Sequence, residues 1–224
     1  MQASELFNQP NTILLDGGMG TMLQAAGMKL GTRPEDLNLE NPELIRSIHA
    51  KYAAAGSRVV NANTFGASPH KLADSKYTLE EVITAGIANC KQAVAPYGAL
   101  VTLDVGPLGE LLEPSGTLAF EDAVAEYGRI VRAGVAAGAD ILYFETFTDL
   151  YEMKAALLAA KENSTLPIMA SMSFEANGRT FTGCTVESFA ATARGLGANA
   201  VGINCSLGPK EIFPMAKRLA EAVR

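Results

Sequence analysis

The feature of this sequence that most constrains its fold is a repeated alternation between two kinds of segment. Short apolar or β-branched runs each lead, through glycine or polar residues, into longer amphipathic stretches rich in Ala, Leu, Glu and Lys. No linker or change of composition interrupts this alternation, which favours one continuous parallel sheet with helical crossovers. Six short runs are predicted strands, at residues 13–17, 58–65, 100–105, 140–146, 167–174 and 199–205.

The stretches between these runs are predicted helices, and their ends carry local signals. NPELIRSIHAKYAAAG begins with Asn41 and Pro42, a capping residue followed by proline at the first helical position. Gly56 and Gly138 stand where two of the helices should end. The sequence therefore predicts a strand-helix unit that recurs along the whole chain.

Two parallel architectures fit this pattern, a doubly wound open sheet and a (β/α)8 barrel. Nearly every predicted strand ends in polar or ionisable residues, which a barrel would gather at one mouth, and this favours the barrel. GLGANA at residues 195–200 follows a helix and precedes a strand, the reverse of a dinucleotide-binding motif. The polar strand ends are Asp16, Asn63, Thr64, Asp104, Glu145, Thr146, Ser171, Ser173, Asn204 and Cys205.

A closed barrel of this type needs eight strands and about 250 residues. The 224-residue chain supplies about six β/α units, the last ending in the helix GPKEIFPMAKRLAEAVR. We therefore expect an α/β fold of the (β/α)8 TIM-barrel type in which strands 7 and 8 are missing. Residues 1–224 are expected to form one barrel domain, incomplete at its C-terminus.

Composition excludes several classes of partner. The net charge of −6, from 24 acidic and 18 basic residues, offers no positive surface for nucleic acid. No apolar run approaches the roughly 20 residues needed to span a bilayer, and the N-terminus lacks a signal-peptide pattern. Three cysteines are an odd number in a chain too large to need disulfides, which predicts free thiols and a cytoplasmic location.

Five stretches of the chain carry a family resemblance. LLDGGMGTML, VNANTFGAS, LDVGPLGELLEP, ILYFETFTDL and VGINCS occur in the order and at roughly the spacing found in the homocysteine S-methyltransferase family. The resemblance runs from about residue 12 to about residue 208 and includes the first module of cobalamin-dependent methionine synthase and the betaine-dependent enzymes. It implies a (β/α)8 barrel that transfers a methyl group to the thiol of homocysteine and yields methionine.

The resemblance implies that Asp16 and Glu145 hold the ammonium group of the substrate. Charge-assisted hydrogen bonds from two carboxylates to one cation suit this task. Asp16 has the alternative of a helix cap, and Glu145 has the alternative of a structural ion pair, since a carboxylate in the apolar run ILYFETF needs a definite partner.

Further residues at the strand ends are candidates for substrate binding. The backbone N–H groups of Gly17 and Gly18 can receive the substrate carboxylate, although a tight strand-to-helix turn also explains both glycines. Asn63 and Asp104 are expected to line the pocket or order water there. Their alternative role is to satisfy backbone groups in the loops.

The resemblance identifies Cys205 as a zinc ligand and the catalytic residue of this chain. Zinc ionises a bound thiol at neutral pH, and three protein sulfurs would leave the fourth position for homocysteine. The other two family ligands, an adjacent cysteine pair in a GGCCG-type motif, are absent, so the zinc site is incomplete.

The remaining cysteines and histidines do not complete this site. Cys184 is a poor second candidate for a zinc ligand, and Cys90 is expected in the core. Solvated or capping roles are expected for His49 and His70. A simple core role is the alternative for Cys205.

Three functions follow, of which the first is homocysteine methyl transfer through a zinc-activated thiolate. The donor is expected to be methylcobalamin or methyltetrahydrofolate on or from a separate protein, with S-methylmethionine or a betaine also open. The partners expected beside the substrate are a corrinoid protein or a chain that completes an incomplete family member. The second function is a metal-free amino-acid-binding module that is inactive without a completing partner. The third, an aldol-type or phosphosugar barrel enzyme, lacks a lysine on any predicted strand.

Overall fold

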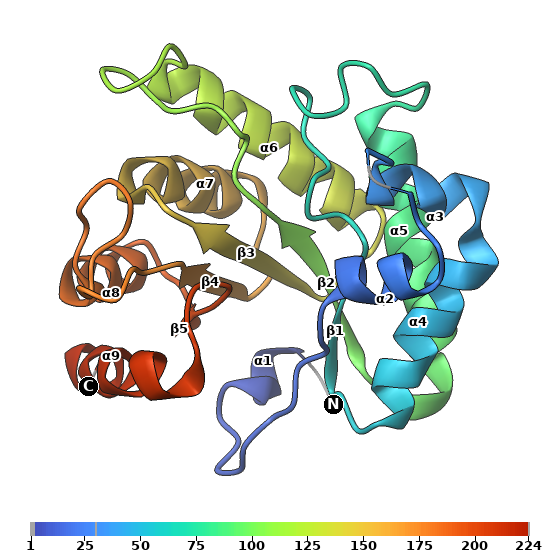
Figure 1. The fold of residues 1–224 in the computed structure, drawn as a ribbon, viewed down its shortest axis with the longest axis horizontal. Helices are drawn as coiled ribbons and strands as arrows, with labels where there is room; N and C mark the ends of the chain where they lie inside the picture. Colours follow the sequence, from blue (N-terminus) through green and yellow to red (C-terminus); the bar gives the residue numbers. More distant parts are fainter. Residues whose placement is uncertain (1–2, 30, 224) are drawn as a thin grey trace.

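The computed structural model describes residues 3–29 and 31–223, whose apolar runs form one sheet of five parallel strands. The strands pair in chain order, β1-β2-β3-β4-β5, as expected of consecutive β/α units. Helices follow one another along the outer side of the curved sheet, which confirms a partial barrel of the predicted type (Figure 1). The strands are β1 (Val59–Asn61), β2 (Leu100–Val105), β3 (Ile141–Phe147), β4 (Ile168–Met172) and β5 (Ala200–Ile203).

The first predicted strand, residues 13–17, is not a strand in the structure. It runs beside β1 and forms a single parallel bridge between Leu15 and Val59. The amide of Asp16 donates to the Val59 carbonyl at 3.1 Å, and the amide of Arg58 donates to the Leu14 carbonyl at 2.8 Å. Glycines follow Asp16 directly, so the pairing stops after one residue. The prediction of six strands was therefore wrong by one, although the segment keeps its predicted place.

Within residues 3–29 and 31–223, six long helices connect or follow the strands, and the predicted end signals are confirmed. The side chain of Asn41 accepts the Leu44 amide at 3.3 Å, and Gly56 and Gly138 adopt φ values of 109° and 87° just past their helices. The long helices are α4 (Pro42–Ala54), α5 (Leu79–Val94), α6 (Phe120–Ala136), α7 (Leu150–Asn163), α8 (Val186–Gly195) and α9 (Pro209–Ala222). The short ones are α1 (Ala3–Leu6), α2 (Met19–Ala25), η1 (Pro34–Asp36), α3 (Leu37–Glu40) and η2 (Ala95–Tyr97).

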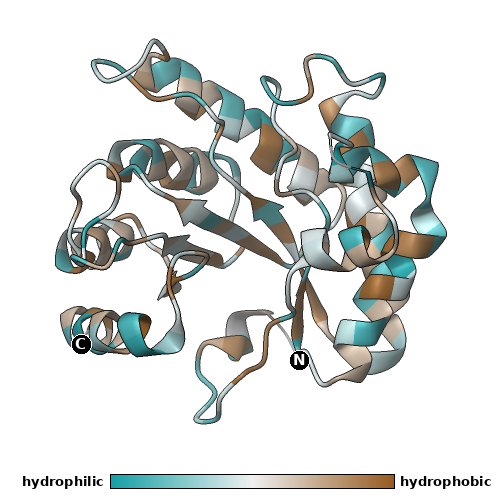
Figure 2. Cartoon of the chain, in the orientation of Figure 1, coloured by the Kyte–Doolittle hydropathy of each residue, from teal (hydrophilic) through white to brown (hydrophobic). Residues whose placement is uncertain are grey.

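Alternate residues of each strand face opposite sides of the sheet. On the outer side, Val60, Leu103 and Phe144 are fully buried in the main core under the helices. On the inner side, a smaller apolar cluster lies toward the start of the strands, and Leu6 of α1 packs onto it. In Figure 2 the hydrophilic colour lies at the arrowheads of β2 and β3, at the carboxyl ends of these strands.

The remaining cysteine and histidine predictions have mixed outcomes. All three cysteines are free, and Cys90 is buried in α5 with its Sγ 3.8 Å from the Val60 carbonyl oxygen. His70 is exposed, as expected. His49 is fully buried in α4, so the expected solvated or capping role was wrong. Among the described residues, no helix is long and apolar enough to cross a membrane.

His49 makes the stability of the fold pH-dependent. Neither ring nitrogen has a hydrogen-bond partner among the described residues, and burial lowers the pKa from 6.5 to about 4. Below pH 6.5 the unfolded chain binds a proton that the folded chain does not, so acid lowers the free energy of unfolding. We expect the free energy of unfolding of the wild-type chain to fall by about 2 kcal/mol between pH 6.5 and pH 5 because of His49. In His49→Leu this part of the fall should be absent, as measured by urea unfolding at each pH. Exposed His70→Gln should leave the pH profile unchanged, and identical profiles for wild type and His49→Leu would contradict this assignment.

Candidate functional site

The inner face of the sheet carries polar side chains near the carboxyl ends of the strands. Leu100 belongs to the inner apolar cluster, so Thr102 and Asp104 share its face by alternation. Tyr143 also belongs to that cluster, which places Glu145 on the same face of β3. The polar residues that follow the inner apolar positions are Asn61, Thr102, Asp104, Tyr143, Glu145, Ser171 and Asn204. We call Asp16, Asp104 and Glu145 together the carboxylate cluster.

Asp16 lies at the edge of the sheet beside β1. Its Oδ2 accepts the Asn61 amide at 3.0 Å, while its Oδ1 is buried without a hydrogen-bond partner among the described residues. Burial raises the pKa of Asp16 to about 7 against the lowering effect of the Asn61 amide, and the Glu145 charge raises it further. The N-cap of α2 is Gly18, so Asp16 is not the helix cap considered as its alternative role.

Glu145 sits in an irregular part of β3. The pairing of β3 with β4 shifts between Phe144 and Phe147, and Thr146 adopts a left-handed φ of 65° that is unusual for a β-branched residue. Both phenylalanines therefore reach the outer core while Glu145 stays on the inner side. Burial raises the pKa of Glu145, against a lowering hydrogen bond from Tyr143. No lysine or arginine among the described residues forms an ion pair with it, so its alternative role is not seen.

Asn204, directly after β5, holds this irregular segment in place. Its Nδ2 donates to Glu145 Oε2 at 3.0 Å and to Thr146 Oγ1 at 2.8 Å. Its Oδ1 accepts the Thr146 amide at 3.1 Å and the Ser171 hydroxyl at 2.9 Å. One amide side chain therefore ties together the ends of β3, β4 and β5 and offsets the strain at Thr146.

Asp104 is the most enclosed member of the carboxylate cluster. The residue is 7% exposed, and its Oδ1 has no hydrogen-bond partner among the described residues. Burial raises the pKa of Asp104 well above its usual range, and the charges of Glu145 and Asp16 are the next causes. The Thr64 hydroxyl bonds only the backbone of Asp104, accepting its amide at 3.1 Å and donating to its carbonyl at 2.8 Å.

Asn63 is not brought to the carboxylate cluster. β1 ends at Asn61, earlier than predicted, and the chain then turns toward the helices. The Asn63 side-chain Nδ2 donates to the Pro34 carbonyl at 2.8 Å and to Asn38 Oδ1 at 3.0 Å. Its amide group therefore holds the loop after β1, which was the alternative considered for it.

Gly17 and Gly18 lie between Asp16 and α2. A Cβ on Gly17 would come within 2.8 Å of the Tyr52 ring, so a close approach of that ring requires glycine here. The Tyr52 hydroxyl donates to the Gly18 carbonyl at 3.1 Å. Neither glycine amide donates a hydrogen bond to another described residue, so both are available to an acceptor.

Cys205 follows Asn204 and is exposed, with a left-handed φ of 50°. Cys205 is the last of the causes that raise the pKa of Asp104, after burial and three carboxylates. Among the described residues, no group of three His, Cys, Asp or Glu side chains is arranged to hold a metal ion. One thiolate does not provide a zinc site, so the residues present do not fit the metal that the sequence suggested.

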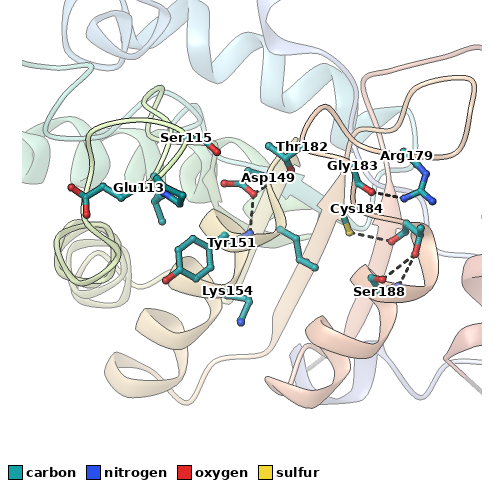
Figure 3. A pocket seen from close by; sticks show the side chains of 14 residues that line it. Glu113, Ser115, Asp149, Tyr151, Lys154, Arg179, Thr182, Gly183, Cys184 and Ser188 are labelled. Atoms are coloured by element: carbon teal, nitrogen blue, oxygen red, sulfur yellow. Dashed lines mark hydrogen bonds between the residues drawn. The ribbon is translucent and has the colours of Figure 1, made fainter.

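Cys184 lines a groove of about 580 Å³ (Figure 3), whereas Cys205 is not among its lining residues. The groove is formed by the loop after β2, the start of α7 and the loop before α8, and Figure 3 shows Cys184 among the side chains that line it. The Cys184 thiol donates to the Thr185 carbonyl at 3.1 Å. Asp16, Asp104, Glu145 and Cys205 do not line this groove.

The fold and the carboxylate cluster define an α/β protein of the parallel barrel class, with an anionic site at the carboxyl ends of its strands. The chain belongs to the homocysteine S-methyltransferase family, whose model matches residues 13–224. It is 28% identical to the methionine synthase of Mycobacterium tuberculosis over 93% of this chain and 19% of that protein. The methionine synthase of Mycobacterium leprae gives the same identity and coverage, so the chain spans about a fifth of these relatives.

Solved structures show the same fold. The homocysteine methyltransferase MmuM from Escherichia coli in its metallated form has a TM-score of 0.88 at 24% identity, covering 99% of this chain and 84% of that one. Its apo form has a TM-score of 0.77 at 23% identity, covering 97% of this chain and 80% of that one. These likenesses bear out the predicted barrel architecture.

Sequence reasoning noted Asn204 and Ser171 as polar strand ends but did not assign them to the site, and it missed Asn61, Thr102 and Tyr143. Except for Asn204, each of these residues stands two positions after an apolar residue on the inner face of its strand, and this spacing is visible in the sequence. It could not be used for prediction, because the sequence does not show which of the two alternating sets of residues in a strand faces inward.

Asn204→Ala should loosen the end of β3. The substitution removes the acceptor of the Thr146 amide and a donor to Glu145, and we expect it to lower the free energy of unfolding by about 2 kcal/mol, measured by urea denaturation. The exposed neighbour Ser206→Ala is the control and should change stability by less than about 0.5 kcal/mol. Equal stability of Asn204→Ala and wild type would show that Asn204 does not hold this segment.

Proposed function

We propose that the inner carboxyl end of the sheet binds the amino-acid part of homocysteine, for methyl transfer to its thiol with methionine as the product. The observation that carries this proposal is a pair of carboxylates, Asp16 and Glu145, that face one side of the sheet without a cation. In a chain of the homocysteine S-methyltransferase family, an ammonium group is the cation that such a pair would receive. Burying anions without a positive partner is costly, and the substrate would remove part of that cost.

Each residue has a separate task in this proposal. Asp16 and Glu145 hold the ammonium group, and the free amides of Gly17 and Gly18 bind the α-carboxylate. Asn204 and Tyr143 orient Glu145 through hydrogen bonds and do not touch the substrate. Cys205 marks the side toward which the substrate sulfur points. In the reaction, this sulfur loses its proton to solvent and forms a bond to the methyl carbon, while the bond between that carbon and the donor breaks and its electron pair stays with the donor.

Zinc has no assigned step here, because the described residues do not supply a site for it. Cys205 remains the one residue proposed as a sulfur ligand, should other ligands come from a partner. Methylcobalamin or methyltetrahydrofolate, on or from a separate protein, are the proposed methyl donors. A corrinoid protein or a completing chain are the proposed partners, in the cytoplasm.

A second candidate function is amino-acid binding without a metal. The absence of a metal-holding group among the described residues favours it, since the proposed contacts of the carboxylate cluster and the glycine amides involve no metal. Calorimetry with homocysteine, with and without zinc, separates the two functions. Equal affinity in both conditions, with no methyl transfer when donors are added, would favour the binding module.

Removal of either carboxylate should weaken binding of the amino acid. We expect Asp16→Asn and Glu145→Gln each to raise the Kd for L-homocysteine by about 10- to 100-fold, because a hydrogen bond to a charged group contributes about 1.5–3 kcal/mol. The exposed Glu175→Gln is the control for general loss of negative charge, and calorimetry is the measurement. Unchanged affinity in both variants would exclude the proposed ammonium site.

Affinity should also rise with pH. Asp16 has a pKa of about 7 in the ligand-free protein, so below pH 7 it is mostly protonated and attracts an ammonium group less. The Kd of L-methionine, a probe without a titrating thiol, should fall between pH 6 and pH 8. In Asp16→Asn this pH dependence should be reduced, and a flat wild-type profile would contradict the role of Asp16.

The purified 224-residue chain should not bind zinc tightly by itself. One cysteine at the site provides too few ligands, so we expect no stoichiometric complex in competition with a chromophoric zinc chelator. Cys205→Ser should change this result little. Tight one-to-one binding that Cys205→Ser abolishes would show a zinc site that the described residues do not reveal.

A further inference from the structure

The carboxylate cluster holds one more acid than the proposed ammonium site uses. None of its three members forms an ion pair with a described lysine or arginine. Two of its oxygens are buried without a hydrogen-bond partner among the described residues, and they belong to Asp16 and Asp104, not to Glu145. A buried carboxylate oxygen without a hydrogen-bond partner lowers the stability of the fold, so its presence indicates that a ligand supplies the missing donor.

Asp104 lies on the same inner face of the sheet as Glu145, because it pairs with Tyr143, two residues before Glu145 on the neighbouring strand. It lies on the inner face of β2, two residues beyond Thr102, whose hydroxyl donates to Asn61 Oδ1 at 2.8 Å on the neighbouring strand. Glu145 and Asp16 are the charges that most affect the pKa of Asp104, after burial. The next carboxylate, Glu35, is already engaged, because its Oε1 accepts the Gly66 amide at 2.7 Å.

The number of acids in the cluster suits a primary ammonium group. Such a group has three N–H donors, each of which can form a hydrogen bond of about 2.8 Å with a carboxylate oxygen. The cluster offers one carboxylate for each of these donors.

We infer that Asp104 contacts the substrate's ammonium group directly, as a third acceptor beside Asp16 and Glu145, and thereby restricts the site to primary amines. An N-methylated amino acid would lose one donor and place a methyl group against a buried carboxylate. This role rests on the proposed function, because it concerns the same amino-acid site. It adds selectivity for primary amines over N-methylated amines, which Asp16 and Glu145 alone would not provide.

Calorimetry with Asp104→Asn tests the role of Asp104. The variant keeps the size of the side chain and replaces the acid with a neutral amide that cannot ionise beside an ammonium group, and we expect the Kd for L-homocysteine to rise about 10- to 100-fold. The desamino analogue 4-mercaptobutyrate lacks the ammonium group, so its Kd should change less than threefold. Asp149→Asn is the matched control, an aspartate at the same end of the sheet that caps α7 and lies outside the cluster, and asparagine caps equally well.

A measurement on the wild-type chain tests selectivity without any variant. N,N-dimethylhomocysteine should bind at least tenfold more weakly than L-homocysteine, and thermal unfolding should verify that Asp104→Asn is folded. Equal wild-type affinity for the two amines, or unchanged homocysteine affinity in a folded Asp104→Asn, would overturn the role of Asp104 and leave the Asp16 and Glu145 site intact. Failure of the wild-type chain to bind homocysteine, with or without zinc, would overturn both proposals.

Discussion

Parallel pairing of β1 to β5 brings all five carboxyl ends to one edge of the sheet, and the site depends on this arrangement. Alternation then divides each strand into an outer set that packs under the helices and an inner set that changes from apolar to polar along the strand. The inner apolar cluster, closed by Leu6 of α1, supports the start of the strands. The polar residues beyond it are therefore presented on a rigid base, as a binding site requires.

The site holds three acids that form no ion pair with a described lysine or arginine. Burial raises the pKa of Asp16, Asp104 and Glu145, so in the ligand-free chain these groups hold protons more tightly than in water. The cluster destabilises the fold above the ordinary carboxyl pKa, because the unfolded chain would ionise freely there. A bound ammonium group would offset that cost, which explains why stability and binding oppose each other at these positions.

The irregular end of β3 shows how the fold positions a reactive group at some local cost. Thr146 and Cys205 both adopt left-handed backbone angles. The Asn204 side chain forms hydrogen bonds with Thr146, and Cys205 directly follows Asn204 in the sequence. The shift in pairing lets Phe144 and Phe147 share the outer core while Glu145 remains on the inner face. Backbone strain is thus concentrated beside the site, where hydrogen bonds from one asparagine compensate for it.

The sequence by itself determined the class of fold, the order of the strands and the family, because periodicity and motif spacing are local properties that survive without coordinates. It also named Asp16, Asp104, Glu145 and Cys205 as residues at strand ends. Only the tertiary structure decided that Asn63 turns away, that residues 13–17 form one bridge instead of a strand, and that His49 is buried. These outcomes depend on which neighbours meet across the sheet and the helices, and contacts between residues distant in sequence leave no local pattern.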